Sequence, residues 1–162
     1  MKKLKIVLSI FLILVIIAGG YVGNMLGVFN EGNYGEYSLK DTASVSDSPI
    51  NGKTVIFLGS SVTFGYGSLG VSFADFLEKT DGITAVKEAV SGTTLADIRE
   101  NSYVSRLKKV DKSLDIDLFI CQLSTNDATI GIALPEIEKA IRFILEYVKS
   151  NFNCPIVFYT GT

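Results

Sequence analysis

The chain has 162 residues, of which 48% are hydrophobic and 20% are charged, and its formal net charge is −2. This length and composition predict one folded domain with an appendage and argue against a disordered chain. The small negative charge, with Lys and Arg scattered beyond the first five positions, excludes the basic surface that a nucleic-acid-binding protein needs.

The N-terminal segment has the composition of a membrane-spanning helix. Lysines precede the apolar residues 6–29, which carry no charge until Glu31. Such a helix can cross the roughly 30 Å core of a bilayer, and the flanking charges predict that the N-terminus lies inside and the rest outside. We predict that residues 1–29 are an uncleaved signal-anchor, so that the protein is single-pass in the cell membrane with its domain extracytoplasmic. The alternative is a signal peptide cleaved near Ala18 and Gly20, which would leave the domain secreted.

The remaining chain divides into a tether and a domain. Residues 30–51 are rich in Gly, Ser, Asp and Asn without hydrophobic periodicity, which predicts a linker. Over residues 52–162, short apolar runs alternate with helical patterns, which predicts a parallel sheet with helices on both faces, a flavodoxin-like three-layer α/β/α sandwich. The expected strands are residues 54–59, 83–90, 117–123 and 155–160, and the expected helices are residues 72–79, 94–110 and 135–152.

Local sequence patterns support these helices. Ser72 with Asp75, and Thr94 with Asp97, have the spacing of capping boxes, and Pro135 suits the first turn of a helix. This last helix has one apolar stripe, which we assign to the core: Ile137, Ala140, Ile141, Ile144, Leu145 and Val148.

The two cysteines, Cys121 and Cys154, lie in separate apolar runs and match no metal-ligand spacing. The sequence also lacks histidine, which is the commonest protein ligand of metals such as zinc. We expect both thiols to be small core side chains rather than a disulfide, and we expect no metal and no organic cofactor.

Hydroxyl, glycine and amide residues gather after three of the expected strands. These clusters are "GSSVTFG" at residues 59–65, "SGTT" at 91–94 and "STND" at 124–127. Because ligands bind at the carboxyl ends of parallel strands, the clusters predict one shared site. Acyl transfer needs a nucleophilic oxygen on a tight turn and N–H donors for an oxyanion. Ser61 suits the first task, and its own N–H, the N–H of Gly92 and the amide of Asn126 suit the second.

From about residue 54 onward the chain resembles the SGNH or GDSL-type hydrolases. The family block G-D-S-x-T-x-G matches "GSSVTFG", which implies Ser61 as the nucleophile. "AVSGTT" matches the second block and "STND" matches G-x-N-D, which implies Gly92 and Asn126 as oxyanion donors. Ser60 stands where the family has Asp, and Ser124 where it has Gly, so loop rigidity and subclass differ from the usual pattern.

The fourth family block, Asp-x-x-His near the C-terminus, has no match, because the sequence contains no histidine. In the family this His is the general base, and the sheet continues into a fifth strand and a final helix. The expectation is therefore a truncated SGNH domain without its base, inactive on its own. Its strand 155–160 is apolar on both faces, so we also expect poor folding of the isolated chain.

The resemblance implies an extracytoplasmic serine esterase. Its location suggests carboxylic ester substrates such as acetyl groups on polysaccharide or short acyl lipids, with the membrane as a partner through the N-terminal helix. The alternative is a catalytically inactive surface binding module on the same fold.

The sequence also contains a match to the dinucleotide-binding motif, since "GYGSLG" at residues 65–70 fits G-x-G-x-x-G and Glu88 follows it. That interpretation is disfavoured because six residues separate Leu58 from Gly65, whereas the first glycine should follow the strand directly.

Overall fold

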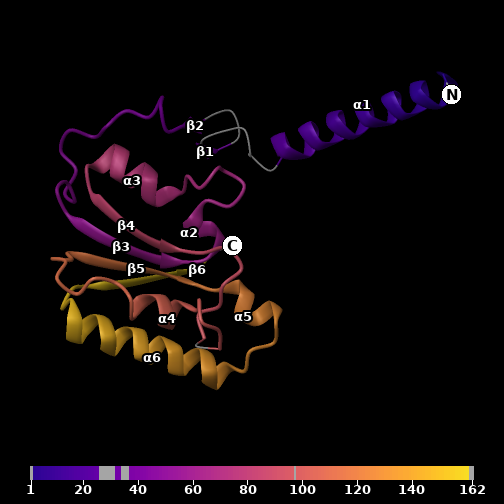
Figure 1. The fold of residues 1–162 in the computed structure, drawn as a ribbon. Coiled ribbons are helices and arrows are strands. Elements are labelled where there is room, and N and C mark those ends of the chain that lie inside the picture. Colours follow the sequence, from indigo (N-terminus) through magenta and orange to yellow (C-terminus); the bar gives the residue numbers. More distant parts are fainter. Residues whose placement is uncertain (1, 26–31, 34–36, 97, 161–162) are drawn as a thin grey trace.

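The computed structural model describes residues 2–25, 32–33, 37–96 and 98–160. Its centre is a parallel sheet of four strands in the order β4-β3-β5-β6 (Figure 1). The strands are β3 (Thr54–Gly59), β4 (Thr84–Ala89), β5 (Leu118–Leu123) and β6 (Ile156–Thr160). Counted along the chain this order is 2-1-3-4, which is typical of flavodoxin-like sheets. The predicted fold class is confirmed.

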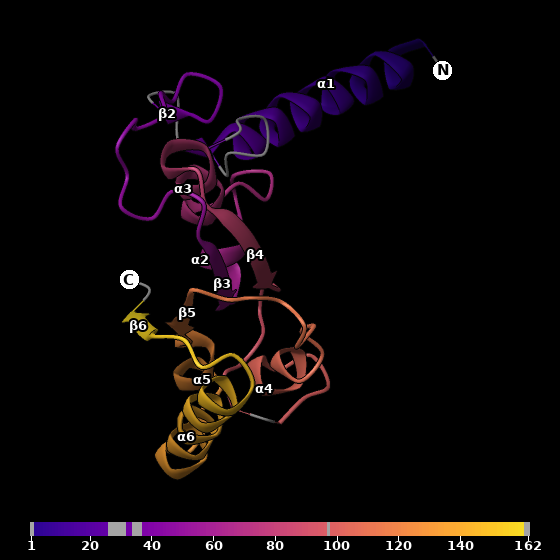
Figure 2. The ribbon, with the colours of Figure 1, turned by 90° about the vertical axis from the view of Figure 1, so that its left-hand side faces the viewer.

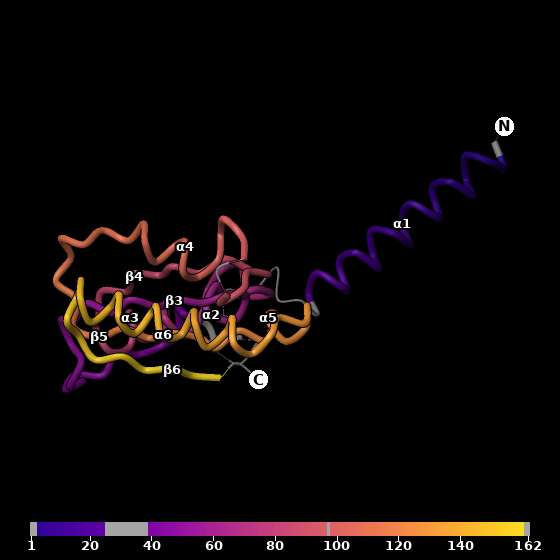
Figure 3. Tube along the Cα trace, turned by 90° about the horizontal axis from the view of Figure 1, so that it is seen from below, coloured from indigo at the N-terminus to yellow at the C-terminus, as the bar shows by residue number. Residues whose placement is uncertain are grey.

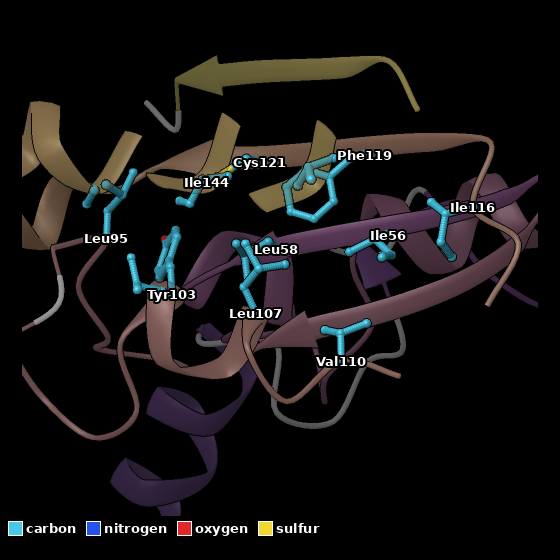
Figure 4. Close-up of a cluster of buried hydrophobic side chains, with 13 residues drawn as sticks. Ile56, Leu58, Leu95, Tyr103, Leu107, Val110, Ile116, Phe119, Cys121 and Ile144 are labelled. Atoms are coloured by element: carbon cyan, nitrogen blue, oxygen red, sulfur yellow. The ribbon is translucent and has the colours of Figure 1, made fainter. Parts of the chain in front are cut away.

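Helices cover both faces of this sheet (Figure 2). On one face α3 (Phe73–Asp81) packs its Phe73 and Leu77 against Val55 and Phe57 of β3. On the other face α4 (Tyr103–Leu107) and α6 (Leu134–Asn151) enclose a larger apolar core (Figure 4). The fully buried members of this core with at most 2% exposure are Ile56, Leu58, Leu95, Tyr103, Val104, Leu107, Phe119, Cys121, Ile144 and Val148.

Two of the predicted helix starts are observed. The Ser72 side chain accepts a hydrogen bond from the Ala74 N–H (3.3 Å), and the Asp75 carboxylate accepts from the Ser72 N–H (2.6 Å), which completes the capping box of α3. Pro135 lies in the first turn of α6. The buried face of this helix comprises Ala140, Ile144 and Val148, as its apolar stripe predicts. The assignment of Leu145 to the core is wrong, because this side chain lies at the edge of the stripe and is 40% exposed.

The predicted helix over residues 94–110 is wrong in its first half, because α4 begins only at Tyr103. The N–H groups of Leu95 and Ala96 donate to the buried carboxylate of Asp127 at 2.8 and 2.9 Å, so this backbone is held in a turn by a distant residue. Ser102 caps α4 instead, accepting from the Ser105 N–H at 3.1 Å. The partner proposed for Thr94 in a capping box, Asp97, lies outside the described residues.

The N-terminal helix α1 (Lys2–Met25) includes a 22-residue apolar stretch that is long enough to cross a membrane or to serve as a signal sequence (Figure 3). Within the predicted linker, the short strands β1 (Gly32–Asn33) and β2 (Tyr37–Ser38) pair antiparallel. Further along, the Val45 N–H donates to the Thr80 carbonyl (2.7 Å) and Ser48 Oγ donates to Asp81 (2.7 Å). The end of the linker is therefore bonded to the C-terminal end of α3.

Candidate active site

The three polar clusters lie at the carboxyl ends of β3, β4 and β5, which are neighbours in the sheet. Ser61, Gly92 and Asn126 line one open pocket of about 380 Å³, together with Tyr66 and Ser91. The strand order reverses between β3 and β5, and this switch point is where doubly wound sheets bind ligands. The structure thus brings together all three residues that the sequence singled out.

Ser60 and Ser61 differ in accessibility although they are adjacent. Ser60 is only 1% exposed, and its Oγ makes no hydrogen bond of good geometry to a described residue. Ser61 begins the short helix α2 (Ser61–Phe64), is partly exposed and lines the pocket. Of these two serines, only Ser61 therefore presents its hydroxyl to a molecule in the pocket.

A glutamine on β5 fixes the turn that carries Ser61. Oε1 of Gln122 accepts hydrogen bonds from the Ser60 N–H (3.1 Å), the Thr63 N–H (3.3 Å) and Thr63 Oγ1 (2.8 Å). Gly59 is required beside it, since a Cβ at that position would lie 1.8 Å from Thr63 Oγ1. This role of Gln122 was not predicted, although a lone polar residue inside the apolar run 118–123 was the available signal.

Asn126 is held in position by its amide. It lies in the short helix α5 (Thr125–Thr129), capped by Ser124, whose Oγ accepts from the Asn126 N–H at 3.2 Å. Nδ2 of Asn126 donates one hydrogen to the Thr93 carbonyl at 2.8 Å. Because a carboxamide nitrogen carries two hydrogens, the second remains for a ligand in the pocket.

Gly92 has a positive φ of 75°, and an added Cβ would find no atom within 4 Å. No described residue accepts a hydrogen bond from its N–H. The backbone at Gly92 is therefore open to a ligand.

The neighbouring Asp127 is 1% exposed and does not line the pocket. Its carboxylate instead accepts the N–H groups of Leu95 and Ala96, which ties the end of β5 to the loop after β4. Sequence reasoning assigned no role to this residue, because its partners are more than 30 positions away.

The glycine-rich segment 65–71 forms a closed loop at the mouth of the pocket. Gly65 has a φ of 86°, and a Cβ there would lie 2.3 Å from the Val71 carbonyl oxygen. Its own carbonyl accepts from the N–H groups of Ser68 (3.0 Å) and Gly70 (3.2 Å). Lys87 Nζ donates to the Gly70 carbonyl at 2.7 Å and holds this loop against β4. Because α2 separates it from β3, the segment lacks the position that a dinucleotide fingerprint requires.

The two departures from the family pattern meet at Tyr103. The hydroxyl of Tyr103 faces those of Ser60 and Ser124, and burial raises the pKa of Tyr103 to about 12. Neither the Tyr103 hydroxyl nor Ser60 Oγ makes a hydrogen bond of good geometry to a described residue. Tyr103 therefore stays protonated next to the turn of Ser60 and Ser61, with its ring among Leu58, Leu95 and Ile144 (Figure 4).

Both cysteines are free thiols, and burial raises the pKa of Cys121 to about 12, so this side chain is an inert core residue. In the part of the chain that the structure describes, no group of three His, Cys, Asp or Glu side chains is arranged to hold a metal ion.

The parallel sheet with helices on both faces and a pocket at its switch point has the fold of the SGNH hydrolases. AlinE4, an esterase of the SGNH-hydrolase family, superposes with a TM-score of 0.56 and 26% identity over 71% of this chain and 60% of its own. The predicted resemblance to the SGNH/GDSL-type hydrolases is therefore confirmed.

Other solved structures share the fold at lower identity. Axe2, an acetylxylan esterase from Geobacillus stearothermophilus, has a TM-score of 0.50 and 21% identity over 67% of this chain and 59% of its own. A protein from Lactobacillus plantarum has a TM-score of 0.58 and 19% identity over 68% of this chain and 57% of its own. This chain thus spans about 57% to 60% of the length of these three structures. No family model and no curated protein matches the sequence.

Proposed function

We propose that this domain belongs to a serine esterase in which Ser61 is the nucleophile. The observation that carries the proposal is the convergence of Ser61, Gly92 and Asn126 on one pocket from three different strand ends. The pocket thereby holds an accessible serine hydroxyl together with the N–H of Gly92 and the amide of Asn126. The 26% identity to the esterase AlinE4 supports the same reaction class.

In the proposed mechanism, Ser61 Oγ attacks the ester carbonyl carbon and its proton passes to a general base. The negative charge on the carbonyl oxygen is then stabilised by the N–H groups of Ser61 and Gly92 and by the second hydrogen of Asn126 Nδ2. The tetrahedral intermediate then collapses: its C–O bond to the alkoxide breaks, the protonated base gives its proton to that oxygen, and the alcohol departs, leaving an acyl-serine. Water hydrolyses this ester and restores Ser61.

The presence or absence of a general base for Ser61 decides between this proposal and a second candidate function. Because the sequence contains no histidine, none of these 162 residues supplies the imidazole that usually accepts the serine proton. That observation favours a catalytically inactive binding module on the same fold as the alternative function.

An activity assay distinguishes the two functions. We expect the protein expressed from its natural gene to hydrolyse p-nitrophenyl acetate and to be labelled by a fluorophosphonate, with the label on Ser61 when the peptides are sequenced by mass spectrometry. Ester binding without turnover or labelling would favour the binding module, and a label on another serine would contradict the assignment of Ser61.

The proposed substrates and location follow from the N-terminal helix. We propose that residues 1–29 anchor the protein in the cell membrane and that residues 30–51 tether an extracytoplasmic SGNH domain of residues 52–162. The reactive ester would then be an acetyl group on polysaccharide or a short acyl lipid at the cell envelope. The apolar stretch Lys3–Asn24 and the lysines that precede its core support this topology.

Fractionation of cells tests the anchor. We expect the protein to sediment with membranes, to resist washing with alkaline carbonate and to be released by detergent, because about 20 apolar residues bind a bilayer almost irreversibly. N-terminal sequencing should then return the uncleaved N-terminus, which begins Met1, Lys2, Lys3. Recovery of the protein from the medium with an N-terminus near Tyr21 would instead show a cleaved signal peptide.

A further inference from the structure

A charged side chain lies buried beneath the pocket. Arg106, on α4, is 7% exposed and lines none of the pocket. The only carboxylate near it among the described residues is that of Glu88, at 4.0 Å and itself partly exposed. Burial lowers the pKa of this guanidinium, and the Glu88 charge acts in the opposite direction. Burying a charge in this way is costly unless hydrogen bonds compensate it.

The compensating bonds join the loops that carry the candidate site. Arg106 Nη2 donates to the Gly59 carbonyl at 2.7 Å and lies 3.3 Å from Thr93 Oγ1. Nη1 donates to the Glu88 carbonyl, and Nε donates to the Asn101 carbonyl at 3.1 Å. One planar group therefore bridges the end of β3, the end of β4 and the loop that leads to α4.

Two of these acceptors lie close in the chain to the proposed catalytic groups. Gly59 precedes the turn of Ser60 and Ser61, and Thr93 follows Gly92. The Thr93 carbonyl is also the acceptor of Asn126 Nδ2, at 2.8 Å. Thr93 is thus bonded to Arg106 through its hydroxyl and to Asn126 through its carbonyl. The Gly59 carbonyl, which also accepts from Arg106, immediately precedes the turn of Ser60 and Ser61.

We propose that Arg106 is a positioning residue. It sets the separation between the turn of Ser60 and Ser61 and the proposed oxyanion donors at Gly92 and Asn126. The inference rests on the proposed esterase function. A lysine would keep the charge, but its single ammonium group lacks the planar fork of five N–H donors that reaches several acceptors at once. The spacing of the two loops therefore depends on the shape of the guanidinium as well as on its charge.

The test is Arg106→Lys in the protein expressed from its natural gene, with the exposed Arg142→Lys on α6 as the matched control. We expect kcat to fall by about 100-fold in Arg106→Lys with little change in KM, because a displacement of about 1 Å between reacting groups costs this much. Arg142→Lys should leave both constants unchanged. If kcat of Arg106→Lys fell only in proportion to the fraction of the variant that is folded, the loss would reflect unfolding and would overturn the proposal.

Chemical rescue of an Arg106 variant tests whether the shape of the guanidinium positions the loops or whether its charge alone stabilises the fold. In Arg106→Ala, added methylguanidinium should restore part of kcat, whereas methylammonium at the same concentration should not. Equal rescue by the two cations would show that a positive charge alone is needed and would overturn the proposal.

Hydrogen exchange supplies a readout that does not depend on turnover. In Arg106→Lys, peptides that cover residues 59–65 and 88–96 should exchange faster than in the wild type, while the peptide over residues 118–123 stays protected. Faster exchange over all three segments would indicate a general structural role, and unchanged exchange would indicate none, so either result contradicts the proposal. If the wild-type protein lacks esterase turnover, the proposed function fails, and this exchange pattern still decides the role of Arg106 in holding the loops.

Discussion

Replacing Ser61 by alanine is expected to lower kcat for p-nitrophenyl acetate on the order of 10⁶-fold, to the level that binding and the oxyanion donors alone support. The methyl group of alanine cannot attack the carbonyl, and the nearby Ser60 and Ser91 do not replace it, because both of their hydroxyl oxygens are buried. The measurement is steady-state hydrolysis by the protein expressed from its natural gene, with circular dichroism to show that the variant is folded.

Ser60→Ala is the matched control for this substitution. Its hydroxyl makes no hydrogen bond of good geometry to a described residue, so its removal should leave most of the activity. Equal losses in the two variants, or a loss in Ser60→Ala alone, would overturn the assignment of Ser61 as the nucleophile.

Asn126→Ala should lower kcat by about 100-fold to 1000-fold, the usual effect of removing one oxyanion donor. The amide meets negative charge only in the transition state, so KM should change much less. The measurement is the pair of constants for the same ester, determined on the folded variant.

Thr125→Ala provides a control on the same turn of α5, since Thr125 is exposed and outside the pocket. We expect near wild-type constants for this variant. If Asn126→Ala raised KM and left kcat intact, Asn126 would bind substrate in the ground state and would not be an oxyanion donor.

The strands, and the polar clusters at their carboxyl ends, were predictable from local sequence. Residues 54–59 and 117–123 are short apolar runs followed at once by hydroxyl residues, and the carboxyl ends of parallel strands meet at one edge. That rule alone brings Ser61, Gly92 and Asn126 together. The capping box at Ser72 was equally local, because both of its partners lie within three residues.

The features that were not predictable depend on contacts between distant residues. The helix expected from Thr94 is interrupted because the Asp127 carboxylate, on another segment, takes the N–H groups of Leu95 and Ala96. Gln122 stands out in the sequence only as a polar residue in an apolar run, and Arg106 does not stand out. Gln122 accepts from the Ser60 N–H, 62 positions away, and Arg106 donates to the Gly59 carbonyl, 47 positions away. Such partners become visible only when the strands are assembled.

The closed loop at residues 65–71 has a consequence for how this scaffold diversifies. Its two ends lie close together at Gly65 and Val71, and Lys87 holds the Gly70 carbonyl, whereas the Tyr66 N–H donates to the Ser61 carbonyl at 2.9 Å. The exposed Leu69 is therefore the tip of the loop that lies outside these contacts. Since lengthening a surface loop whose ends are already joined adds little entropic cost, this tip is a natural insertion point. In the proposed esterase, a segment inserted at this tip would lie beside Tyr66 at the mouth of the pocket, where it would change substrate preference while Ser61, Gly92 and Asn126 stay in place.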